Sequence, residues 1–565
     1  MRHPMKKNRP GRRLHRFHGG IHLPDNKAQS TARAVRTASL PRHLILPLQQ
    51  HIGQIAEPLV AVGDPVLKGQ MIARAQGYIS APVHASSSGT VVEIADHPVP
   101  HPSGLNAPCI VIETDGEERW CELPPPISDP LSLDEAEMRG RIRDSGIVGL
   151  GGAAFPTGVK INPGAGHEIH TLVINGAECE PYITCDDMLM RGQAQRIITG
   201  IAISRFLLGA RQVLIAIEDN KPEAIAAMRA ALDASGMDRA EVVVIPTLYP
   251  SGGERQLIQI LTGQEVPSGG IPAQIGLVCQ NVATAAAISD AVVDGRPLIS
   301  RHITLTGGGI AEPVNLEALI GTPLNELVEQ AGGYTGEAAR LILGGPMMGF
   351  SLTHDRLPLT KASNCLLAAS AEEAPPPRPA SACIRCGRCA DACPARLLPQ
   401  QLYWYARARD IEKTEAYHLF DCIECGCCSH VCPAQIPLVH YFRYAKSASS
   451  AQEQERRRAE HARRRHEARM ARLERLEAER KAKLQNRRAA VAKKKPQPKA
   501  DGDASPDPKQ AAIQAAMRRA AEKKARLARE GQTPKNTENL TEAQQRQIDR
   551  AEQRRAAPDH PPAED

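Results

Sequence analysis

The chain has 565 residues, too many for one ordinary domain, so three or four domains are expected. Its formal net charge of +7 is uneven, because the segment after Tyr444 holds 31 lysines and arginines against 19 acidic residues. The part up to Tyr444 therefore carries −5, which argues against a core that binds nucleic acid.

Residues 1–40 form a basic N-terminal segment. It lacks the apolar region that a secretory signal needs, although its charge leaves a cleaved transit peptide open. No stretch further along the chain approaches 18 continuous apolar residues, so no ordinary transmembrane helix is expected.

Residues 41–125 are predicted to form a small β-sandwich. The spacing of Gly63, Gly69 and Gly89 in its two half-motifs resembles that of the biotinyl and lipoyl carrier fold. Carriers hold a modified lysine in the turn between the halves, but residues 75–78 here are Ala-Gln-Gly-Tyr. We therefore expect a structural sandwich without a carrier function.

Residues 130–297 alternate between helical and strand patterns, which predicts an α/β domain with a largely parallel sheet. Residues 171–175 and 212–217 are predicted to be buried strands, and residues 221–235 a helix. From residue 301 the pattern changes to short strands, glycines and one short helix. We predict a small ubiquitin-like β-grasp module over residues 300–352.

A glycine-rich run, GLGGAAFPTGVK, extends from Gly149 to Lys160. Its spacing fits the dinucleotide fingerprint of Rossmann domains, but that fingerprint must follow a strand, and residues 133–145 have a helical pattern. Pro156 would also fall inside the helix that should come next. We favour a loop laid along a cofactor, with Lys160 placed for a phosphate, and a plain tight turn is the alternative.

The strongest signal is a cysteine motif that occurs twice within residues 370–445. Cys383 to Pro394 and Cys422 to Pro433 both match C-x₂-C-x₂-C-x₃-C-P. In such pairs three close cysteines bind one [4Fe-4S] cluster and the fourth binds the other cluster, which predicts a ferredoxin-like helical domain with two clusters. The predicted ligands are Cys383, Cys386, Cys389 and Cys432 for cluster 1, and Cys393, Cys422, Cys425 and Cys428 for cluster 2.

Zinc is the alternative for these cysteines, but a tetrahedral zinc site gives no role to the third cysteine or to the proline. Cys427 falls outside the spacing and is expected to bind nothing. Nine of the fifteen cysteines lie between Cys383 and Cys432, which fits a metal site in a reducing compartment better than a disulfide framework.

Residues 446–565 are rich in Arg, Lys, Glu, Ala and Gln. We expect a basic, partly helical and partly disordered tail with an amphipathic helix within residues 511–530. Such a tail fits contact with an anionic membrane surface, or a solvated helix without a partner. Nucleic acid is disfavoured because the basic run has no interleaved aromatic residues for base stacking.

Four runs resemble the flavin elements of the NADH-oxidising, FMN-binding subunit of respiratory complex I and its relatives: residues 149–160, 175–181, 249–254 and 280–284. Three further features make this resemblance more specific: the doubled cysteine motif, the N-terminal sandwich and the run Gly19–Pro24. The chain is similar, over about residues 17–444, to the C subunits of Rnf-type ion-translocating NAD:ferredoxin oxidoreductases.

The resemblance implies an FMN site and a site for NADH. The residues implied to hold FMN are Gly149, Gly151, Gly152, Lys160, Asn175, Glu178, Tyr249, Gly252, Asn281 and Thr284. Glu180 and Glu254 would flank the nicotinamide and are the candidate catalytic residues. Two positions depart from the pattern, with Ala154 in place of a glycine and Ala177 where complex I has an acidic residue.

The function that the resemblance implies is that of a peripheral subunit on the cytoplasmic side of a bacterial inner membrane. It would oxidise NADH at FMN, or run in reverse, and pass single electrons through two [4Fe-4S] clusters. The acceptors would be integral-membrane and iron–sulfur subunits of the same complex. Two alternatives are a soluble flavin–iron–sulfur subunit of an NAD-linked dehydrogenase, which usually has a single cluster motif here, and a non-catalytic iron–sulfur adaptor without flavin.

Overall fold

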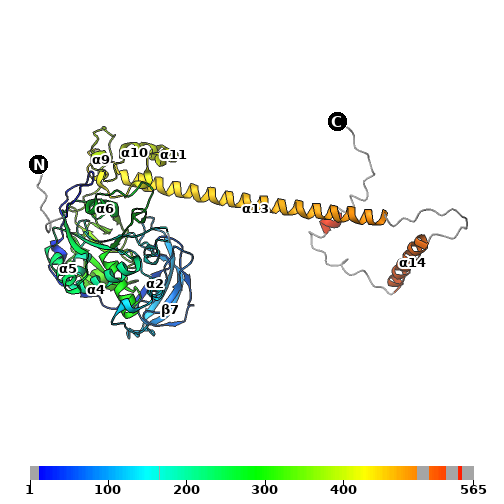
Figure 1. Cartoon of the computed structure of the whole chain (residues 1–565), viewed down its shortest axis with the longest axis horizontal. Coiled ribbons are helices and arrows are strands. Elements are labelled where there is room, and N and C mark those ends of the chain that lie inside the picture. Colours follow the sequence, from blue (N-terminus) through cyan, green and yellow to red (C-terminus); the bar gives the residue numbers. More distant parts are fainter. Residues whose placement is uncertain (1–11, 165, 493–507, 530–544, 550–565) are drawn as a thin grey trace. The chain divides into compact units, whose positions relative to one another are not determined.

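The computed structural model describes residues 12–164, 166–492, 508–529 and 545–549 (Figure 1). The chain divides into two compact units, Met1–Ala459 and Glu460–Asp565. Among the described residues, no helix combines the length and the apolar character needed to cross a bilayer. The start of the predicted N-terminal segment and several parts of the predicted tail lie outside the described residues.

The predicted β-sandwich consists of two antiparallel sheets, with strand orders β2-β8-β7-β4 and β3-β5-β6. The strands are β2 (His43–Pro47), β3 (Glu57–Pro58), β4 (Pro65–Val66), β5 (Met71–Arg74), β6 (Val83–His84), β7 (Gly89–Pro98) and β8 (Asn106–Thr114). Alternate side chains of β2 and β8 face the core, so Leu44, Leu46, Ile110 and Ile112 are fully buried.

The predicted α/β domain contains a four-stranded parallel sheet in the order β11-β10-β9-β12. Its strands are β9 (Thr171–Gly176), β10 (Gln212–Glu218), β11 (Ala240–Ile245) and β12 (Leu277–Asn281). Its helices are α2 (Glu135–Asp144), α3 (Thr157–Lys160), α4 (Cys185–Leu208), α5 (Pro222–Ser235), α6 (Glu254–Thr262) and α7 (Val282–Ser289). The two predicted strands and the predicted helix are therefore confirmed.

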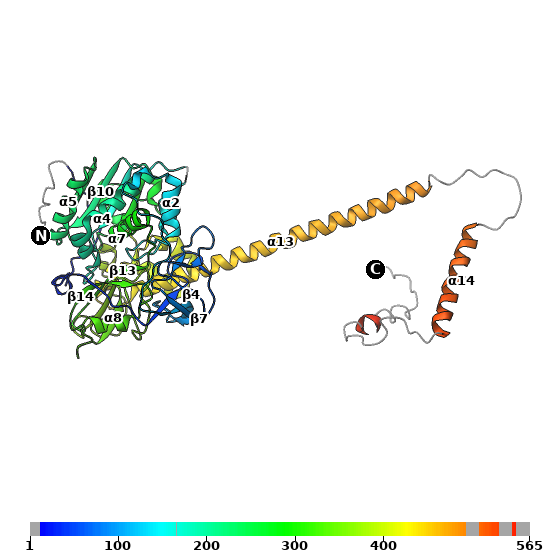
Figure 2. The same ribbon diagram turned by 90° about the horizontal axis from the view of Figure 1, so that it is seen from below.

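Helices cover both faces of this sheet, which explains its continuous apolar strands. Helices α4, α5 and α7 pack on the face that carries Ile174 and Ile215 (Figure 2). Helix α6 packs on the opposite face against Val173 and Leu214. The loops that follow the strands lie at the carboxyl edge of the sheet.

A six-stranded mixed sheet follows, in the order β1-β14-β13-β17-β15-β16. It comprises β1 (Arg36–Thr37), β13 (Ser300–Thr306), β14 (Val314–Leu319), β15 (Arg340–Leu343), β16 (Phe350–Ser351) and β17 (Cys365–Ala369), with helix α8 (Leu324–Gln330) packed against it. The module predicted over residues 300–352 accounts for four of these strands. The other two come from outside it, and β17 pairs with both β13 and β15 in the middle of the sheet.

The cysteine domain is helical, as predicted. Its elements are α9 (Arg388–Asp391), α10 (Pro399–Ala408), α11 (Ile411–Ala416), α12 (Cys427–His430) and the start of α13 (Leu438–Ala492). Helices α10 and α11 lie between the two cysteine motifs. Leu402, Ile411 and Phe442 form the centre of a small core in which the motif cysteines also lie.

The predicted boundary between the cysteine domain and the tail, at residues 445/446, lies inside α13. No glycine or proline interrupts the helix there, so it continues unbroken. Ala445 and Ser449 are buried against the cysteine domain, and the first compact unit ends only at Ala459.

In the second unit α13 continues, and α14 (Pro508–Arg529) overlaps the amphipathic helix predicted at 511–530. The side chains of α13 are exposed here. Pairs four residues apart, such as Glu460 with Arg464 and Glu477 with Lys481, stabilise such a solvated helix.

The N-terminal segment joins the α/β domain to the cysteine domain. Backbone hydrogen bonds run both ways between Ile21 and Tyr249, at 2.8 and 3.0 Å. On the other side, His18 Nδ1 lies 2.9 Å from the carbonyl oxygen of Cys393. A Cβ at Gly19 would come within 2.6 Å of the Ala392 backbone, so this approach requires glycine. The run Gly19–Pro24 thus connects the α/β domain and the cysteine domain, and we call it the strap.

Candidate functional site

The predicted flavin elements meet at the carboxyl edge of the parallel sheet. Asn175 lies near the end of β9, Asn281 ends β12, and Tyr249 is in the loop after β11. Because parallel strands share one carboxyl edge, and α/β sheets bind ligands there, the topology brings these separate runs together.

The glycine-rich loop lies against the start of α7. The backbone N–H of Leu150 donates a 2.9 Å hydrogen bond to Thr284 Oγ1. A Cβ at Gly151 would approach the Asn281 side chain to 3.3 Å. Asn281 itself caps α7 through its Oδ1. The loop and the fourth flavin run therefore form one wall.

The other side of the loop is open. The N–H of Gly149 closes the loop by donating to the Phe155 carbonyl at 2.8 Å. A Cβ at Gly152 would meet nothing within 4 Å. Ala154, one of the two departures from the family pattern, has a φ of 47°. That left-handed conformation explains why glycine is usual there, and it costs alanine about 1–2 kcal/mol.

Lys160 and Glu254 contact each other. Lys160 Nζ lies 2.6 Å from Glu254 Oε2, and the two side chains are 35% and 39% exposed. Burial lowers the pKa of Lys160, but Glu254 and Cys279 together raise it by more, so the pKa lies above its usual value. The ammonium group stays charged and accessible to a second anion.

Asn175 holds two flavin runs together. Its Nδ2 donates a 2.8 Å hydrogen bond to the Gly252 carbonyl, and its Oδ1 accepts from the N–H of Ala177 at 3.1 Å. Ala177, the second departure, is fully buried, and a Cβ at Gly252 would lie 3.4 Å from its methyl group. An acidic side chain at this position would be forced into a packed apolar space.

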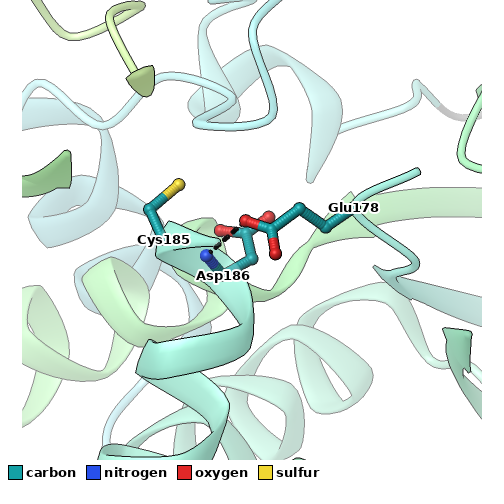
Figure 3. A group of neighbouring side chains, drawn as sticks. All are labelled: Glu178, Cys185 and Asp186. Atoms are coloured by element: carbon teal, nitrogen blue, oxygen red, sulfur yellow. Dashed lines mark hydrogen bonds between the residues drawn. The ribbon is translucent and has the colours of Figure 1, made fainter. Parts of the chain in front are cut away.

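The Glu178 side chain points to the first turn of α4, where Asp186 lies (Figure 3). Its carboxylate accepts from the N–H groups of Asp186 and the following residue, at 2.7 and 3.2 Å. Burial raises its pKa to about 8, with Lys27 opposing and Asp186 adding to the rise. Oxygens of both carboxylates and the sulfur of Cys185 lie within 4.8 Å of one another. Since Asp186 also accepts from Asn281 at 2.6 Å, both carboxylates have hydrogen-bond partners within the chain.

Glu180 is tied to the loop between β15 and β16. Its Oε1 accepts from the N–H groups of Met347 and Met348, at 2.7 and 3.0 Å. Burial raises the pKa of Glu180, and these two donors oppose the rise. The structure therefore places Glu180 at the border with the six-stranded sheet, in a fixed position.

Tyr249 lies between the flavin elements and the cysteine domain. Its hydroxyl group donates a 2.7 Å hydrogen bond to the carbonyl of Cys425. Burial raises the pKa of this phenol, so it remains a donor. Tyr249 is thus the direct contact between the predicted flavin site and the second cysteine motif.

The edge fits a flavin mononucleotide by the chemistry of its groups. Lys160 offers a cation for a phosphate, and the glycine arm is open at Gly152. Beside Asn281, Gln280 Oε1 is buried and has no hydrogen-bond partner among the described residues. A buried acceptor of this kind suits an N–H group of a bound ring.

Two cavities divide the motif cysteines into the two predicted sets. The first is lined by Cys383, Cys386, Cys389 and Cys432. The second is lined by Cys393, Cys422, Cys425 and Cys428. Each combines three cysteines of one motif with the fourth of the other. Four convergent thiols in an otherwise apolar cavity fit a [4Fe-4S] cluster. Cys427 lines neither cavity and is buried against Tyr249.

Sequence reasoning missed Lys27. Its Nζ donates to the carbonyls of Glu178 and Glu180, at 2.9 and 3.0 Å, and to that of Ile183. These hydrogen bonds hold the backbone of the second flavin run in its conformation. No motif marks this lysine, and its partners lie about 150 residues away in the sequence.

Comparison with family models divides the chain in the same way as the fold. The matches are the RnfC Barrel sandwich hybrid domain at residues 15–117, the Nuo51 FMN-binding domain at 142–290, the SLBB domain at 302–351 and the 4Fe-4S dicluster domain at 382–436. These matches show that the chain contains a barrel-sandwich, an FMN-binding, an SLBB and a 4Fe-4S domain. They also confirm the predicted cofactors, FMN and [4Fe-4S] clusters.

Relatives over the whole chain decide the family. The C subunit of the ion-translocating oxidoreductase complex of Serratia proteamaculans is 48% identical over 554 residues, which covers 98% of this chain and 76% of the relative. The chain belongs to the family of C subunits of ion-translocating oxidoreductase complexes. The protein of this family from Pseudomonas aeruginosa is 55% identical over 473 residues, 83% of this chain. The resemblance inferred from the motifs is confirmed.

Members of this family differ in length. This chain spans 60% of the Pseudomonas aeruginosa relative and 59% of the relative from Erwinia tasmaniensis, which is 50% identical over 85% of this chain. Among solved structures, the NAD⁺-reducing [NiFe]-hydrogenase in the H₂-reduced state is similar over 56% of this chain and 63% of that chain. The identity is 19% and the TM-score is 0.41.

Proposed function

We propose that the chain is the peripheral electron-input subunit of a membrane-bound, ion-translocating oxidoreductase complex. It oxidises NADH, or reduces NAD⁺ in the reverse direction, and delivers single electrons to integral-membrane and iron–sulfur subunits. Membership of the family of C subunits supports this. The observation that carries it is the hydrogen bond from Tyr249 to Cys425, because it joins the flavin edge to the wall of the second cysteine cavity.

Bound FMN takes up an electron pair as a hydride and releases electrons singly, and [4Fe-4S] clusters carry single electrons. The chain binds and orients these groups. The backbone of Gly149, Gly151 and Gly152 would hold the flavin from one side, and Lys160 would bind its phosphate. The other residues that would hold it are Asn175, Glu178, Tyr249, Gly252, Asn281 and Thr284.

Glu180 and Glu254 stand on the nicotinamide side. Glu180 is held by two backbone donors and cannot swing away. Glu254 is paired with Lys160, and a phosphate bound to that lysine competes for the same ammonium group. Phosphate binding therefore leaves the Glu254 carboxylate available to the incoming nicotinamide nucleotide.

The two cysteine sets differ in their position. In the cluster 2 set, Cys425 and Cys428 are buried and Cys425 lies in one apolar cluster with Tyr249, whereas Cys386 of the cluster 1 set is exposed. We therefore assign cluster 2 to the flavin side and cluster 1 to the outer side of the protein.

We place the protein at the cytoplasmic face of a bacterial inner membrane. The basic tail supplies attraction to anionic headgroups, at about 1 kcal/mol for each lysine or arginine near the surface. Nucleic acid is not a partner in this proposal, because the part up to Tyr444 is acidic overall.

Anaerobic reconstitution with iron, sulfide and FMN, followed by addition of NADH, tests the proposal. We expect NADH to bleach the flavin absorbance and the broad cluster absorbance. Cluster absorbance without flavin binding or bleaching would support the non-catalytic adaptor instead. Bleaching by a chain that does not associate with membranes holding the other subunits would support a soluble dehydrogenase component.

A further inference from the structure

The loop between β15 and β16, residues 344–349, brings the six-stranded sheet into contact with Glu180 of the flavin domain. The backbone N–H groups of Met347 and Met348 both donate to Glu180 Oε1, at 2.7 and 3.0 Å. A carboxylate oxygen accepts about two hydrogen bonds, so these donors occupy Oε1 and leave acceptor capacity at Oε2. The loop therefore fixes the carboxylate of Glu180 without using up its ability to bind a ligand.

Gly345 provides the space in which the Glu180 side chain lies. A Cβ added at this glycine would be 2.1 Å from Glu180 Cγ, 2.5 Å from Oε1 and 2.7 Å from Cδ. The three nearest atoms thus belong to one flexible side chain, and none belongs to the backbone. The φ of Gly345 lies outside the left-handed region, so the backbone there accepts an alanine. A methyl group at this position would push Glu180 away from its two donors and leave the loop itself in place.

Other parts of the protein hold the loop. Arg443 of α13 donates a 3.1 Å hydrogen bond to the Met348 carbonyl and pairs with Glu424 at 2.9 Å. A Cβ at Gly426 would lie 2.8 Å from the Met347 carbonyl, so the loop and the second cysteine motif are in direct contact. Because none of these contacts involves a ligand, the two N–H donors are already oriented in the free protein.

We propose that the 344–349 loop is a positioning segment of the nucleotide site, and that the absence of a side chain at Gly345 sets the affinity for NADH. The loop acts through Glu180. It holds this carboxylate on the nicotinamide side, so that Oε2 can accept a hydrogen bond from the nucleotide. A prearranged acceptor binds more tightly than one that must first be ordered. The inference rests on the proposed function, which places Glu180 beside the nicotinamide.

The test measures NADH-dependent dye reduction by the reconstituted full-length chain. We expect Gly345→Ala to raise KM for NADH about tenfold, the scale of losing one hydrogen bond to a charged group. The change falls on KM and not on kcat, because a fixed acceptor binds the nucleotide equally in the ground state and the transition state. Gly336→Ala in the same module is the matched control, since a Cβ there meets nothing within 4 Å, and its KM should equal that of the wild type. FMN and iron contents show whether each variant is folded.

A double variant separates positioning from a general change of structure. In Glu180→Ala the side chain that Gly345→Ala displaces is missing, so both changes together should raise KM no further than Glu180→Ala alone. Arg443→Ala is a second route to the same effect, because it removes the donor to the Met348 carbonyl. We expect it to raise KM about threefold when Glu180 is present, the scale of one lost hydrogen bond, and to change nothing in Glu180→Ala.

The proposal is overturned if Gly345→Ala keeps the wild-type KM, if Gly336→Ala raises KM as much, or if Gly345→Ala has its full effect on top of Glu180→Ala. Should Gly345→Ala not retain FMN, the comparison of Arg443→Ala with and without Glu180 decides in its place. NADH-driven bleaching of the wild-type flavin reports separately on the proposed function. Bleaching together with an unchanged KM in Gly345→Ala removes the positioning role alone, whereas a wild-type chain that does not bleach overturns both.

Discussion

The hydroxyl group of Tyr249 donates a 2.7 Å hydrogen bond to the backbone carbonyl of Cys425. The tyrosine belongs to the flavin domain and the cysteine to the second cluster motif, so one side chain crosses the interface between them. The strap at Ile21 holds the backbone of the same tyrosine from the other side. The position of the cluster 2 cavity relative to the flavin edge is therefore fixed by polar contacts as well as by packing.

Tyr249→Phe removes this donor and leaves the Cys425 carbonyl unpaired in a buried place. We expect a loss of about 1–3 kcal/mol at the domain interface. FMN and iron contents should stay near wild type, while cluster bleaching lags behind flavin bleaching in stopped-flow mixing with NADH. Tyr334→Phe is the matched control, since that hydroxyl pairs with Asp355 in the six-stranded sheet module. Equal lag times in the two variants would show that the contact plays no part in electron transfer from the flavin to the clusters.

The ligand sets can be separated by two cysteine variants. Cys386→Ser removes a thiol from the cluster 1 cavity and should reduce the iron content from about eight to about four per chain. Cys427→Ser should leave both clusters in place, because Cys427 lines neither cavity. Iron and labile sulfide assays after anaerobic reconstitution measure both. Loss of a cluster in Cys427→Ser would require another ligand map.

The glycine arm is tested at Gly151. A valine side chain there would begin 3.3 Å from Asn281, which caps α7 and pairs with Asp186. We expect Gly151→Val to lose FMN, because its branches occupy the wall that the flavin must contact. Gly192→Val on α4 is the control, since a Cβ there meets nothing within 4 Å. FMN fluorescence after gel filtration measures retention, and normal FMN in Gly151→Val would remove this loop from the site.

The cysteine motifs and the glycine-rich loop could be recognised from local spacing, because each motif consists of residues that are close in the chain. The confirmed strands β9 and β10 followed from continuous apolar runs. Contacts between distant segments could not be predicted in this way. The pairing of Lys160 with Glu254 joins residues 94 apart, and Lys27 reaches the second flavin run from the N-terminal segment.

The structure continues past two of the predicted domain boundaries, for a related physical reason. Strand β17 follows the predicted end of the β-grasp module, yet it pairs in the middle of the sheet. Its apolar pattern shows burial but not which sheet buries it. The tail boundary at residue 445 was predicted from a change in composition. Helix α13 crosses it, because helix propensity and the packing of its first turns, not the overall composition, determine where the helix runs.

A buried lysine predicts a specific dependence of stability on pH. Lys361 is 1% exposed, and its Nζ donates to the carbonyls of Pro82 and Gly146, at 2.9 and 2.7 Å. Burial lowers its pKa to about 7, against 10.5 in the unfolded chain. Between these values the unfolded state binds more protons, so this group makes stability rise with pH.

Lys361→Met removes that titration. We expect the free energy of unfolding of the wild-type chain to rise relative to the variant between about pH 7 and 10, by up to about 1.4 kcal/mol per pH unit. Chemical denaturation of the first compact unit at several pH values measures the difference. Lys413→Met, at an exposed site, should show no such trend. A difference between wild type and Lys361→Met that does not change with pH would contradict the assignment.

Two deletions separate the tail from the cysteine domain. Residues 460–565 hold 27 lysines and arginines against 17 acidic residues, a surplus of ten. Deleting them should leave iron, FMN and NADH-dependent dye reduction unchanged, while weakening binding to inner-membrane vesicles at moderate salt. Release should be partial, because the first unit keeps its own docking surfaces.

Deleting residues 446–565 should do more. Lys446 Nζ donates to the Cys422 carbonyl and pairs with Glu424 at 2.8 Å, and the buried Ser449 hydroxyl donates to Glu415 at 2.5 Å. Their loss exposes the wall of the cluster 2 cavity, so we expect less iron per chain as well as weaker membrane binding. Sedimentation with vesicles across a salt series and iron assays on both deletions measure the two effects separately. If the chain ending at Ala459 sediments as the full chain does at every salt concentration, the tail is not a membrane tether.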